Sequence, residues 1–344
     1  MSRRTSWNVA RPWLAPLVPF YAAGAALRSA SLRLGLEPVR HLGWPAVSVG
    51  SLSAGGAGKT PFVIALAALF TDSGLAVDVL SRGYGRRDGR AARVDPAGSA
   101  EVFGDEPILV AQDALIPVYV GARRIEAGRL AETTGAPPGV HLLDDGFQHR
   151  QLARDVDIAL VSSADLQDWL LPAGNLREPL GALGRADVLA IEARDEAALA
   201  RLEALKLGPA VGQQVWRYRR SMRFPNFREP VLAFCGIARA GQFFAGIRAA
   251  GIAVAAEQAF PDHHRFKAAD LVLLRELALR TGAASLMTTA KDLVRLRELP
   301  PLALPVNVAE LVVELEDWVA ASNWLQESLR EPLSRARAQF ATPR

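Results

Sequence analysis

Residues 53–60 have the types and the spacing of a loop that binds the phosphates of a nucleotide. The segment lies between a predicted strand and a predicted helix and reads Ser53-Ala54-Gly55-Gly56-Ala57-Gly58-Lys59-Thr60. Glycines let backbone N–H groups turn toward phosphate oxygens, and the N-terminus of the next helix adds its positive end. Lys59 is predicted to reach the β- and γ-phosphates, and the Thr60 hydroxyl to bind Mg²⁺. The strict pattern has glycine where this chain has Ser53, and the alternative is an ordinary glycine-rich turn.

A pair of carboxylates follows another apolar segment. Residues 140–143 are predicted to form a strand that delivers Asp144 and Asp145 to the edge of a sheet. A carboxylate at this place can hold Mg²⁺ directly or through water. Adjacent side chains point different ways, so one aspartate is expected to face the metal and the other to organise the loop. The alternative is a polar turn at the end of a strand.

Two further groups could act in proton transfer. Asp105 precedes a predicted helix, where an aspartate often serves only as a cap. It could instead orient or deprotonate a hydroxyl, although its usual pKa of about 3.9 makes aspartate a weak base. The run Pro261-Asp262-His263-His264 could be a set of metal ligands, a base dyad or a structural loop.

Short apolar strands alternate with helical stretches along the first two thirds of the chain. This order predicts an α/β fold of the P-loop NTPase kind, with a mostly parallel sheet covered by helices on both faces. The predicted strands are 46–50, 76–80, 116–120, 140–143, 156–161 and 188–191, and the predicted helices are 59–73, 108–114 and 123–133. Ligands bind beyond the carboxyl ends of such strands, where the segments described above would meet.

The sequence suggests four parts. Residues 1–40 form an apolar and basic segment, 41–212 a P-loop kinase domain, 213–229 a ribbon-like linker, and 230–344 a smaller α/β domain with a terminal helix. The linker is placed where apolar and basic residues alternate before prolines. In the smaller domain, strands are expected at 231–234, 252–255, 285–288 and 306–308, and helices at 241–250 and 317–330.

The first of these parts resembles a membrane-surface anchor. Residues 12–27 carry no charge and include aromatic side chains, with arginines on both sides. The run is short for a spanning helix and holds three prolines, so an interfacial position is favoured. The alternative is an N-terminal helix that packs on the protein core.

Composition limits the classes of partner and the setting. The formal net charge of +4 suits an anionic ligand or membrane surface, but is too small to indicate nucleic acid. Cys235 is the one cysteine, so no internal disulfide can form and a reducing, cytoplasmic setting is expected. Nothing in the sequence indicates an obligate protein partner.

Taken together, these segments resemble the tetraacyldisaccharide 4′-kinase family of the lipid A pathway of Gram-negative bacteria. The resemblance extends from about Trp13 to the C-terminal helix. It rests on the order and spacing of seven segments: 55–61, 81–86, 104–107, 144–149, 171–179, 260–263 and 289–292. The run Asp144-Asp145-Gly146-Phe147-Gln148-His149 is the most specific of them. Within this family the loop is recognised by Gly-Gly-x-Gly-Lys-Thr-Pro, so Ser53 is no departure.

The resemblance implies an activity and a location. The family transfers the γ-phosphoryl group of ATP to the 4′-hydroxyl of a tetraacylated glucosamine disaccharide 1-phosphate. ATP and Mg²⁺ are the implied cofactors, and the glycolipid and a membrane surface the implied partners. The implied location is the cytoplasmic face of the inner membrane, with peripheral attachment.

The resemblance also suggests roles for individual residues. Asp105 matches the family's catalytic aspartate and His263 its partner, which would answer the objection that aspartate is a weak base. Further assignments follow with less support: Asp145 in catalytic support, Asp144 and Glu106 with Thr60 at Mg²⁺, and Tyr84, Arg123, Gln148 and Arg177 as contacts of the glycolipid or its phosphate.

Two other functions share part of this pattern. A membrane-recruited P-loop ATPase or GTPase switch would have the same phosphate loop, with water as its acceptor. It would not need Asp105 or His263, and a GTPase should carry an Asn-Lys-x-Asp stretch, whereas Lys291-Asp292 lacks the leading asparagine. A nucleotide-binding scaffold without chemistry would not need the paired acidic loops.

Overall fold

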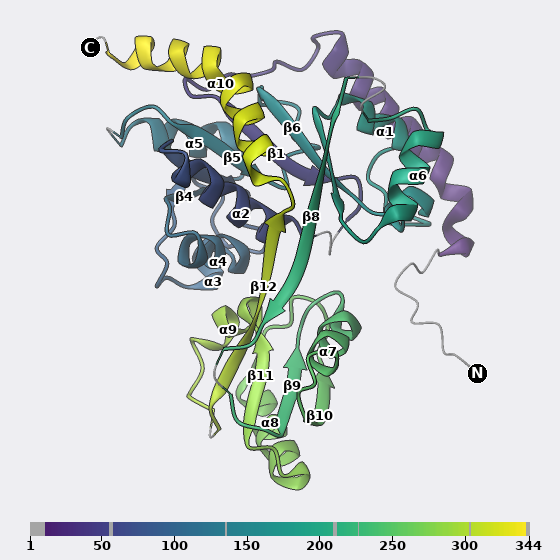
Figure 1. Cartoon of the computed structure of the whole chain (residues 1–344), viewed down its shortest axis with the longest axis vertical. Coiled ribbons are helices and arrows are strands. Elements are labelled where there is room, and N and C mark those ends of the chain that lie inside the picture. Colours follow the sequence, from purple (N-terminus) through teal and green to yellow (C-terminus); the bar gives the residue numbers. More distant parts are fainter. Residues whose placement is uncertain are drawn as a thin grey trace.

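A mostly parallel β-sheet forms the frame of the protein (Figure 1). The computed structural model describes residues 11–54, 58–134, 136–208, 212–225, 227–302 and 304–341. These residues form one sheet of 12 strands in the order β10-β9-β11-β12-β8-β7-β6-β1-β5-β2-β4-β3. The α/β fold with a mostly parallel sheet, expected from the sequence, is confirmed.

The first unit contains the strands that precede the phosphate loop and the acidic loops. Its strands are β1 (Ala46–Ser51), β2 (Val77–Ser81), β3 (Ala92–Arg93), β4 (Val118–Val120), β5 (Val140–Asp144), β6 (Val156–Val161) and β7 (Val188–Glu192). All but β3 are parallel to their neighbours in this unit, and β1 lies between β5 and β6. Parallel strands that are covered on both faces have largely apolar sequences, as the main strands of this unit do. The loops after β1 and β5 therefore meet at one edge of the sheet.

Helices cover both faces of this part of the sheet. On one face lie α2 (Lys59–Asp72) and α4 (Asp105–Asp113), whose apolar side chains pack on β1, β2 and β5. The opposite face is covered by α5 (Arg124–Glu132) and α6 (Glu196–Ala204). Shorter helical segments are α3 (Ala100–Phe103), η2 (Asp165–Gln167) and η3 (Leu180–Arg185). This packing fixes the first residues of α2 and α4 beside the carboxyl ends of the strands.

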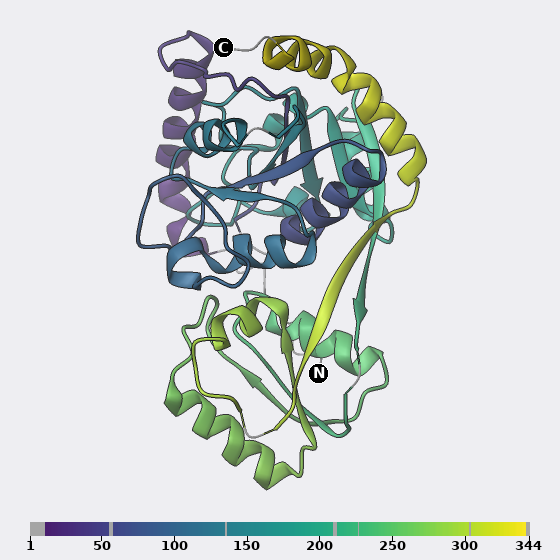
Figure 2. The ribbon, with the colours of Figure 1, turned by 90° about the vertical axis from the view of Figure 1, so that its left-hand side faces the viewer.

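A smaller unit contains β9, β10 and β11, which are parallel to one another. Its elements are β9 (Val231–Cys235), α7 (Ala240–Ala249), β10 (Val254–Ala259), α8 (Ala268–Thr281), β11 (Ser285–Thr289) and α9 (Ala290–Leu296). It has its own apolar clusters on the two faces of its strands. The two units face each other at the start of α4 and along α9 (Figure 2).

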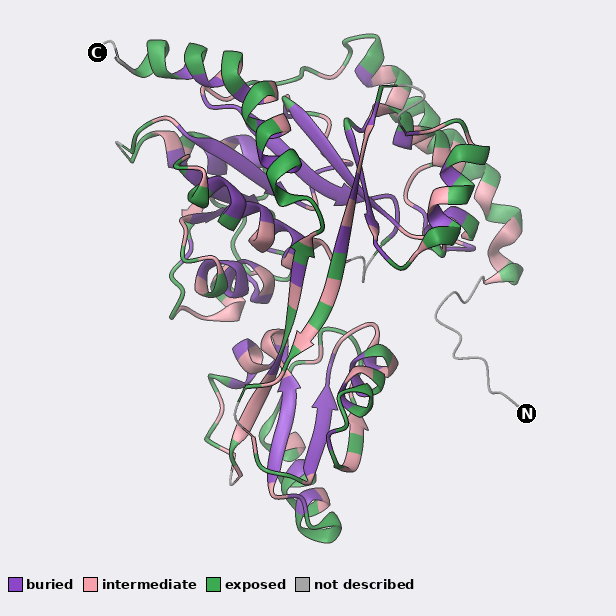
Figure 3. Cartoon of the chain, in the orientation of Figure 1, coloured by how far each residue is buried: buried purple, intermediate pink, exposed green. Residues whose placement is uncertain are grey.

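Two long strands join the units into one sheet. The first half of β8 (Gln214–Arg223) pairs with β7, and its second half pairs in antiparallel fashion with β12 (Val306–Leu315). The first half of β12 in turn pairs with β11. Where the ribbon crosses between the units, many of its residues are exposed or half-buried (Figure 3). The predicted ribbon at 213–229 is thus only one of two connecting strands, because β12 extends well beyond the predicted 306–308.

The C-terminal helix returns to the first unit, which differs from the expected division of the chain. Helix α10 (Trp318–Ala341) places Leu325, Leu329 and Leu333 in the same apolar cluster as α2. Trp324 contacts Trp216 of β8 edge to face, with the ring centroids 5.8 Å apart. The amphipathic pattern predicted this helix but carried no signal for the face that it covers.

The N-terminal helical segment lies along the surface of the first unit. It consists of η1 (Pro12–Leu17) and α1 (Val18–Arg33), and Leu32 is the buried residue of α1. The Tyr21 hydroxyl donates to the carbonyl of Arg177 at 3.0 Å. Several large apolar side chains remain exposed: Trp13, Leu17, Phe20 and Leu27. Within the described part of the chain, no helix is both long and apolar enough to cross a bilayer.

Candidate active site

The first residues of α2 form one side of the site. Gly58 precedes this helix with φ of +72°, a left-handed conformation that glycine adopts without strain. The Lys59 ammonium lies 3.4 Å from the Ser51 hydroxyl and 3.2 Å from Asp145 Oδ1. Thr60 is buried in the first turn of the helix. Gly55, Gly56 and Ala57 lie outside the described residues.

A second loop supports the start of the phosphate loop. Ser53 forms an isolated antiparallel bridge with Leu176, and the Ala54 N–H donates to the carbonyl of Asn175 at 2.9 Å. Asn175 is itself held by Asp168, whose carboxylate accepts from the Asn175 side chain at 2.9 Å. The segment 171–179 therefore fixes residues 53 and 54 at the carboxyl end of β1.

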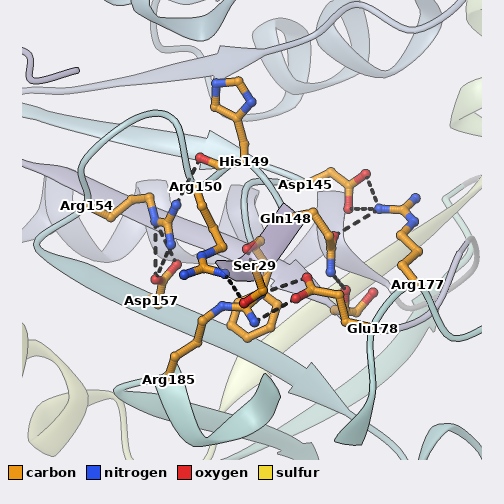
Figure 4. A network of polar contacts seen from close by, with 12 residues as sticks. Ser29, Asp145, Gln148, His149, Arg150, Arg154, Asp157, Arg177, Glu178 and Arg185 are labelled. Atoms are coloured by element: carbon orange, nitrogen blue, oxygen red, sulfur yellow. Dashed lines mark hydrogen bonds and ion pairs between the residues drawn. The ribbon is translucent and has the colours of Figure 1, made fainter. Parts of the chain in front are cut away.

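Asp145 connects the phosphate loop with the same second loop. Its backbone has φ of +51°, which turns the chain sharply after β5. Arg177 Nη1 donates to both carboxylate oxygens of Asp145, at 3.0 and 2.9 Å, and to Gln148 Oε1 at 3.2 Å (Figure 4). Burial raises the pKa of Asp145, but Lys59 and Arg177 outweigh this effect and hold the pKa below its usual value. Asp145 therefore holds the two cations in place.

The neighbouring Asp144 has a different electrostatic environment. It is buried at the end of β5, where burial itself and repulsion from Glu106 and Asp145 raise its pKa to about 7. Arg124 Nη2 donates to the backbone carbonyl of Asp144 at 2.9 Å. A buried carboxyl group that faces two other carboxylates is stabilised in its charged form by a cation. This environment fits Mg²⁺ next to Asp144.

Thr60 and Glu106 line the same cleft as Asp144 and could complete such a site. Mg²⁺ is commonly bound by one or two carboxylates together with the phosphates of the substrate. Among the residues that the structure describes, no three His, Cys, Asp or Glu side chains form a ready-made metal site. In the structure, the Glu106 carboxylate is paired with the ammonium of Lys291 from α9.

Asp105 and His263 come together although they belong to different units. Helix α4 begins at Asp105, with Gly104 as its capping residue, so the Asp105 carboxylate does not cap the helix. It faces the second unit, where His263 Nδ1 lies 3.5 Å from Asp105 Oδ2. Arg295 of α9 binds the same oxygen, with Nε at 2.9 Å. Burial raises the pKa of Asp105, but His263 and Arg295 outweigh it and lower the pKa well below its usual range. The hydrogen bond with Asp105 raises the pKa of His263.

The remaining predicted contacts are distributed unevenly. Tyr84 lies beside His263, with ring centroids 5.8 Å apart, and Gln148 donates to the Ser51 carbonyl at 2.9 Å. Arg123 lies away from this group: its side chain is 65% exposed and paired with Glu126. The neighbouring Arg124 is the arginine that reaches the acidic loop. A contact between Arg123 and the glycolipid therefore stays a prediction, and Arg124 is a member of the site that the sequence did not indicate.

Sequence reasoning also missed Lys291 and Arg295 as members of the site. Both lie on α9, one helical turn apart, and bind Glu106 and Asp105 at the start of α4. In the sequence, the segment 289–292 contributes to the resemblance and argues against a GTPase, but it does not indicate a role for either side chain. Thr289 was the one local signal that could have placed these residues on a helix: its hydroxyl accepts from the Asp292 N–H and caps the start of α9.

These groups line one open cleft of about 2250 Å³ between the units. Its walls include Lys59, Thr60, Glu106, Asp144, Asp145, Gln148, Arg177, His263 and Lys291. The cleft also extends along α1, where it is lined by Tyr21, Gly24, Ala25, Arg28 and Ser29. The phosphate-binding helix, the acidic loop and His263, the partner of the buried Asp105, therefore face a shared space.

Comparison with known proteins agrees with this arrangement. A family model described as tetraacyldisaccharide-1-P 4′-kinase matches residues 10–330. The tetraacyldisaccharide 4′-kinase of Koribacter versatilis is 44% identical over 317 residues, covering 89% of this chain and 95% of the relative. The protein of the same name from Rhodopseudomonas palustris is 38% identical over 333 residues, covering 94% of each chain.

A solved structure extends the similarity to the fold. It is the crystal structure of "apo" form LpxK from Aquifex aeolicus in complex with ATP. The two chains share 32% sequence identity with a TM-score of 0.73, over 92% of this chain and 99% of that one. The chain belongs to the tetraacyldisaccharide-1-phosphate 4′-kinase family.

Proposed function

We propose that this chain carries out the reaction for which its family is named, with the cleft residues in the following roles. The γ-phosphoryl group of ATP passes to the 4′-hydroxyl of a tetraacylated glucosamine disaccharide 1-phosphate, and ADP leaves. The observation that carries the residue assignment is the contact between Asp105 of one unit and His263 of the other, which lines the same cleft as Lys59. A hydrolytic nucleotide switch has no need of such a pair.

The phosphates are bound at the start of α2. The N–H groups of the loop, the positive end of the helix and Lys59 neutralise phosphate oxygens. Arg177 adds a second cation, which Asp145 holds beside Lys59. Because phosphoryl transfer depends on positioning and on neutralising negative charge, this prearranged pair of cations lowers the barrier. Mg²⁺, when bound by Asp144, Thr60 and Glu106, would neutralise further charge on the phosphates.

Asp105 is assigned the role of base. As the bond between the 4′-oxygen and phosphorus forms and the bond to the ADP oxygen breaks, Asp105 takes the proton of the hydroxyl. His263 places Nδ1 beside the carboxylate, orients it and, together with Arg295, keeps it ionised and able to accept the proton. Tyr84, beside His263 at the mouth of the cleft, contacts the sugar.

The glycolipid is expected to enter along α1. The exposed apolar side chains of η1 and α1 can lie among acyl chains, while neighbouring residues of the same helix line the cleft. The region around His149 is strongly basic: burial together with Arg124 and Arg154 lowers the pKa of His149 to about 4. Such a basic region suits the 1-phosphate of the acceptor. Peripheral attachment to the cytoplasmic face of a membrane follows from this entry route.

Transfer of label from γ-labelled ATP to the lipid tests the proposal. The purified protein is mixed with Mg²⁺ and the disaccharide 1-phosphate lipid in detergent, alongside Lys59→Ala and Asp105→Asn. We expect a doubly phosphorylated lipid and a loss of at least about 100-fold for each variant, as for other residues that stabilise a transition state. Free phosphate without labelled lipid would identify an ATPase and overturn the assigned acceptor.

A further inference from the structure

Arg295 of α9 lies where the two units meet and binds several groups at once. Its side chain is 8% exposed, and its guanidinium contacts groups from four segments of the chain. Nη1 donates to the carbonyl of Gly236 after β9, at 2.8 Å, and to Asp292 Oδ1, at 3.1 Å. Nε and Nη2 donate to Asp105, and Nη2 also lies 3.1 Å from His263 Nδ1. One planar group therefore fixes the loop after β9, helix α9, Asp105 and His263 relative to one another.

The contacts with Asp105 are all made on one side of its carboxylate. Arg295 Nε, Arg295 Nη2 and His263 Nδ1 all approach Oδ2. Two nitrogens of one guanidinium thus bind a single oxygen, which fixes the position of Oδ2 more firmly than one donor could. Oδ1 receives none of these contacts, so it is the oxygen left to meet the acceptor hydroxyl.

His263 Nδ1 faces both Arg295 and Asp105, and it cannot bond with both at once. A guanidinium has only donors and a carboxylate only acceptors, so Nδ1 accepts from Arg295 or donates to Asp105. When Arg295 is fully engaged by Asp105, Nδ1–H is free to donate to the carboxylate. The strength of the Arg295–Asp105 contact therefore decides whether His263 joins the carboxylate or the guanidinium.

We propose that Arg295 is a positioning residue for phosphoryl transfer: carried on α9 of the second unit, it orients Asp105 and His263 as one group when the two units meet. This inference rests on the proposed function, because it assumes that Asp105 is the base. Lys291, one turn earlier on α9, binds Glu106 beside Asp105 and keeps the two helices in register. The simpler alternative is that Arg295 only helps to hold the units together, as the Lys291–Glu106 and Arg265–Glu101 ion pairs do.

The test compares Arg295→Gln and Arg295→Lys with Arg297→Gln. Arg297 also reaches across to the first unit, but it donates to the Pro96 carbonyl, at 3.2 Å, and not to Asp105. Label transfer to the lipid is measured with kcat and KM determined separately. We expect Arg295→Gln to lower kcat by about 100-fold with little change in the KM for ATP, as for a misplacement of about 1 Å. Arg297→Gln should retain the activity of the unaltered protein.

A second comparison separates positioning from folding. Combined with Asp105→Asn, Arg295→Gln should cost almost nothing more, because residues that act as a unit are not additive. Arg295→Lys keeps the charge without the fork and should have an intermediate kcat. Equal losses in Arg295→Gln and Arg297→Gln, or losses that add to that of Asp105→Asn, would overturn the positioning role. An unaltered protein that labels no lipid would instead overturn the proposed function.

If Arg295→Gln does not fold, the same double-variant comparison is made with Arg295→Lys. If Arg295→Lys lowers kcat alone but not when added to Asp105→Asn, the proposal is supported. If its loss adds to that of Asp105→Asn, the proposal is contradicted. Binding of ATP, measured directly, should be equal in all the folded variants.

Discussion

Two adjacent aspartates show how much the chemistry of a residue depends on its neighbours in space. Asp144 has its pKa raised to about 7 by burial and by nearby carboxylates, whereas two cations lower the pKa of Asp145. The sequence could place both at the end of β5, because an apolar run ends there. It could not separate their roles, since Arg177 and Glu106 come from other loops.

Asp144→Asn should weaken the response to Mg²⁺. The substitution keeps the shape of the side chain but removes the charge next to which a cation is expected to bind. We expect the Mg²⁺ concentration for half-maximal activity to rise by about 10- to 100-fold, the usual cost of disturbing a metal site. Equilibrium binding of Mn²⁺, used as a probe, should weaken in parallel.

Asp113→Asn is the control for this experiment. Asp113 also lines the cleft, but its raised pKa comes from burial and from Glu310 of β12. Its response to Mg²⁺ and Mn²⁺ should match that of the unaltered protein. A response of Asp144→Asn equal to that of Asp113→Asn would exclude Asp144 as a metal ligand.

At the scale of elements, α1 is the clearest case of an exposed apolar surface with an expected partner. Phe20 and Leu27 are solvent-exposed, while Tyr21 and Ser29 hydrogen-bond to the loops of the cleft. The sequence predicted both the helix and its apolar composition. Whether it packs on the protein or faces outward was left open, and the structure shows that it does both.

Leu27→Glu should reduce binding to membranes. Leu27 is 73% exposed on α1, so the substitution places a charge on the expected membrane-facing surface without opening the core. We expect the fraction of protein that sediments with vesicles of phosphatidylglycerol to fall several-fold. Leu279→Glu is a matched control, because Leu279 is also 73% exposed but lies on α8 of the smaller unit. Equal effects of the two substitutions would contradict a membrane role for α1.

The whole molecule shows which features could be predicted from sequence. The phosphate loop, the acidic loop and most strands were found because each depends on neighbours along the chain. Arg295 and Lys291 were missed because their partners lie 190 and 185 positions away. The return of α10 to the first unit was missed for the same reason. Local signals thus predict elements, while contacts between distant segments decide how the two halves of the site meet.

A buried charged cluster near the amino end of β5, away from the cleft, is expected to couple the stability of the whole molecule to pH. His141 of β5 is fully buried, with Nδ1 2.7 Å from Asp78 Oδ1 and Nε2 3.4 Å from Glu132 Oε1. Burial lowers the pKa of His141, but Asp78 and Glu132 outweigh it and raise the pKa to about 9. The unfolded chain has a histidine pKa of about 6.5.

Because the folded pKa is the higher one, protonated His141 stabilises the native state at low pH. Its contribution is complete below about pH 6.5 and is lost as pH rises through about 9, where both states have released the proton. The shift corresponds to roughly 3 kcal/mol.

Urea unfolding should therefore show the unaltered protein losing stability between pH 6.5 and 9.5 relative to His141→Gln. The difference in unfolding free energy between the two proteins is largest near pH 6.5, where the variant also leaves Asp78 and Glu132 without their cation. His41→Gln, at an exposed position, should follow the unaltered protein at every pH. A gap that stays constant from pH 6.5 to 9.5 would mean that His141 is neutral in the folded protein.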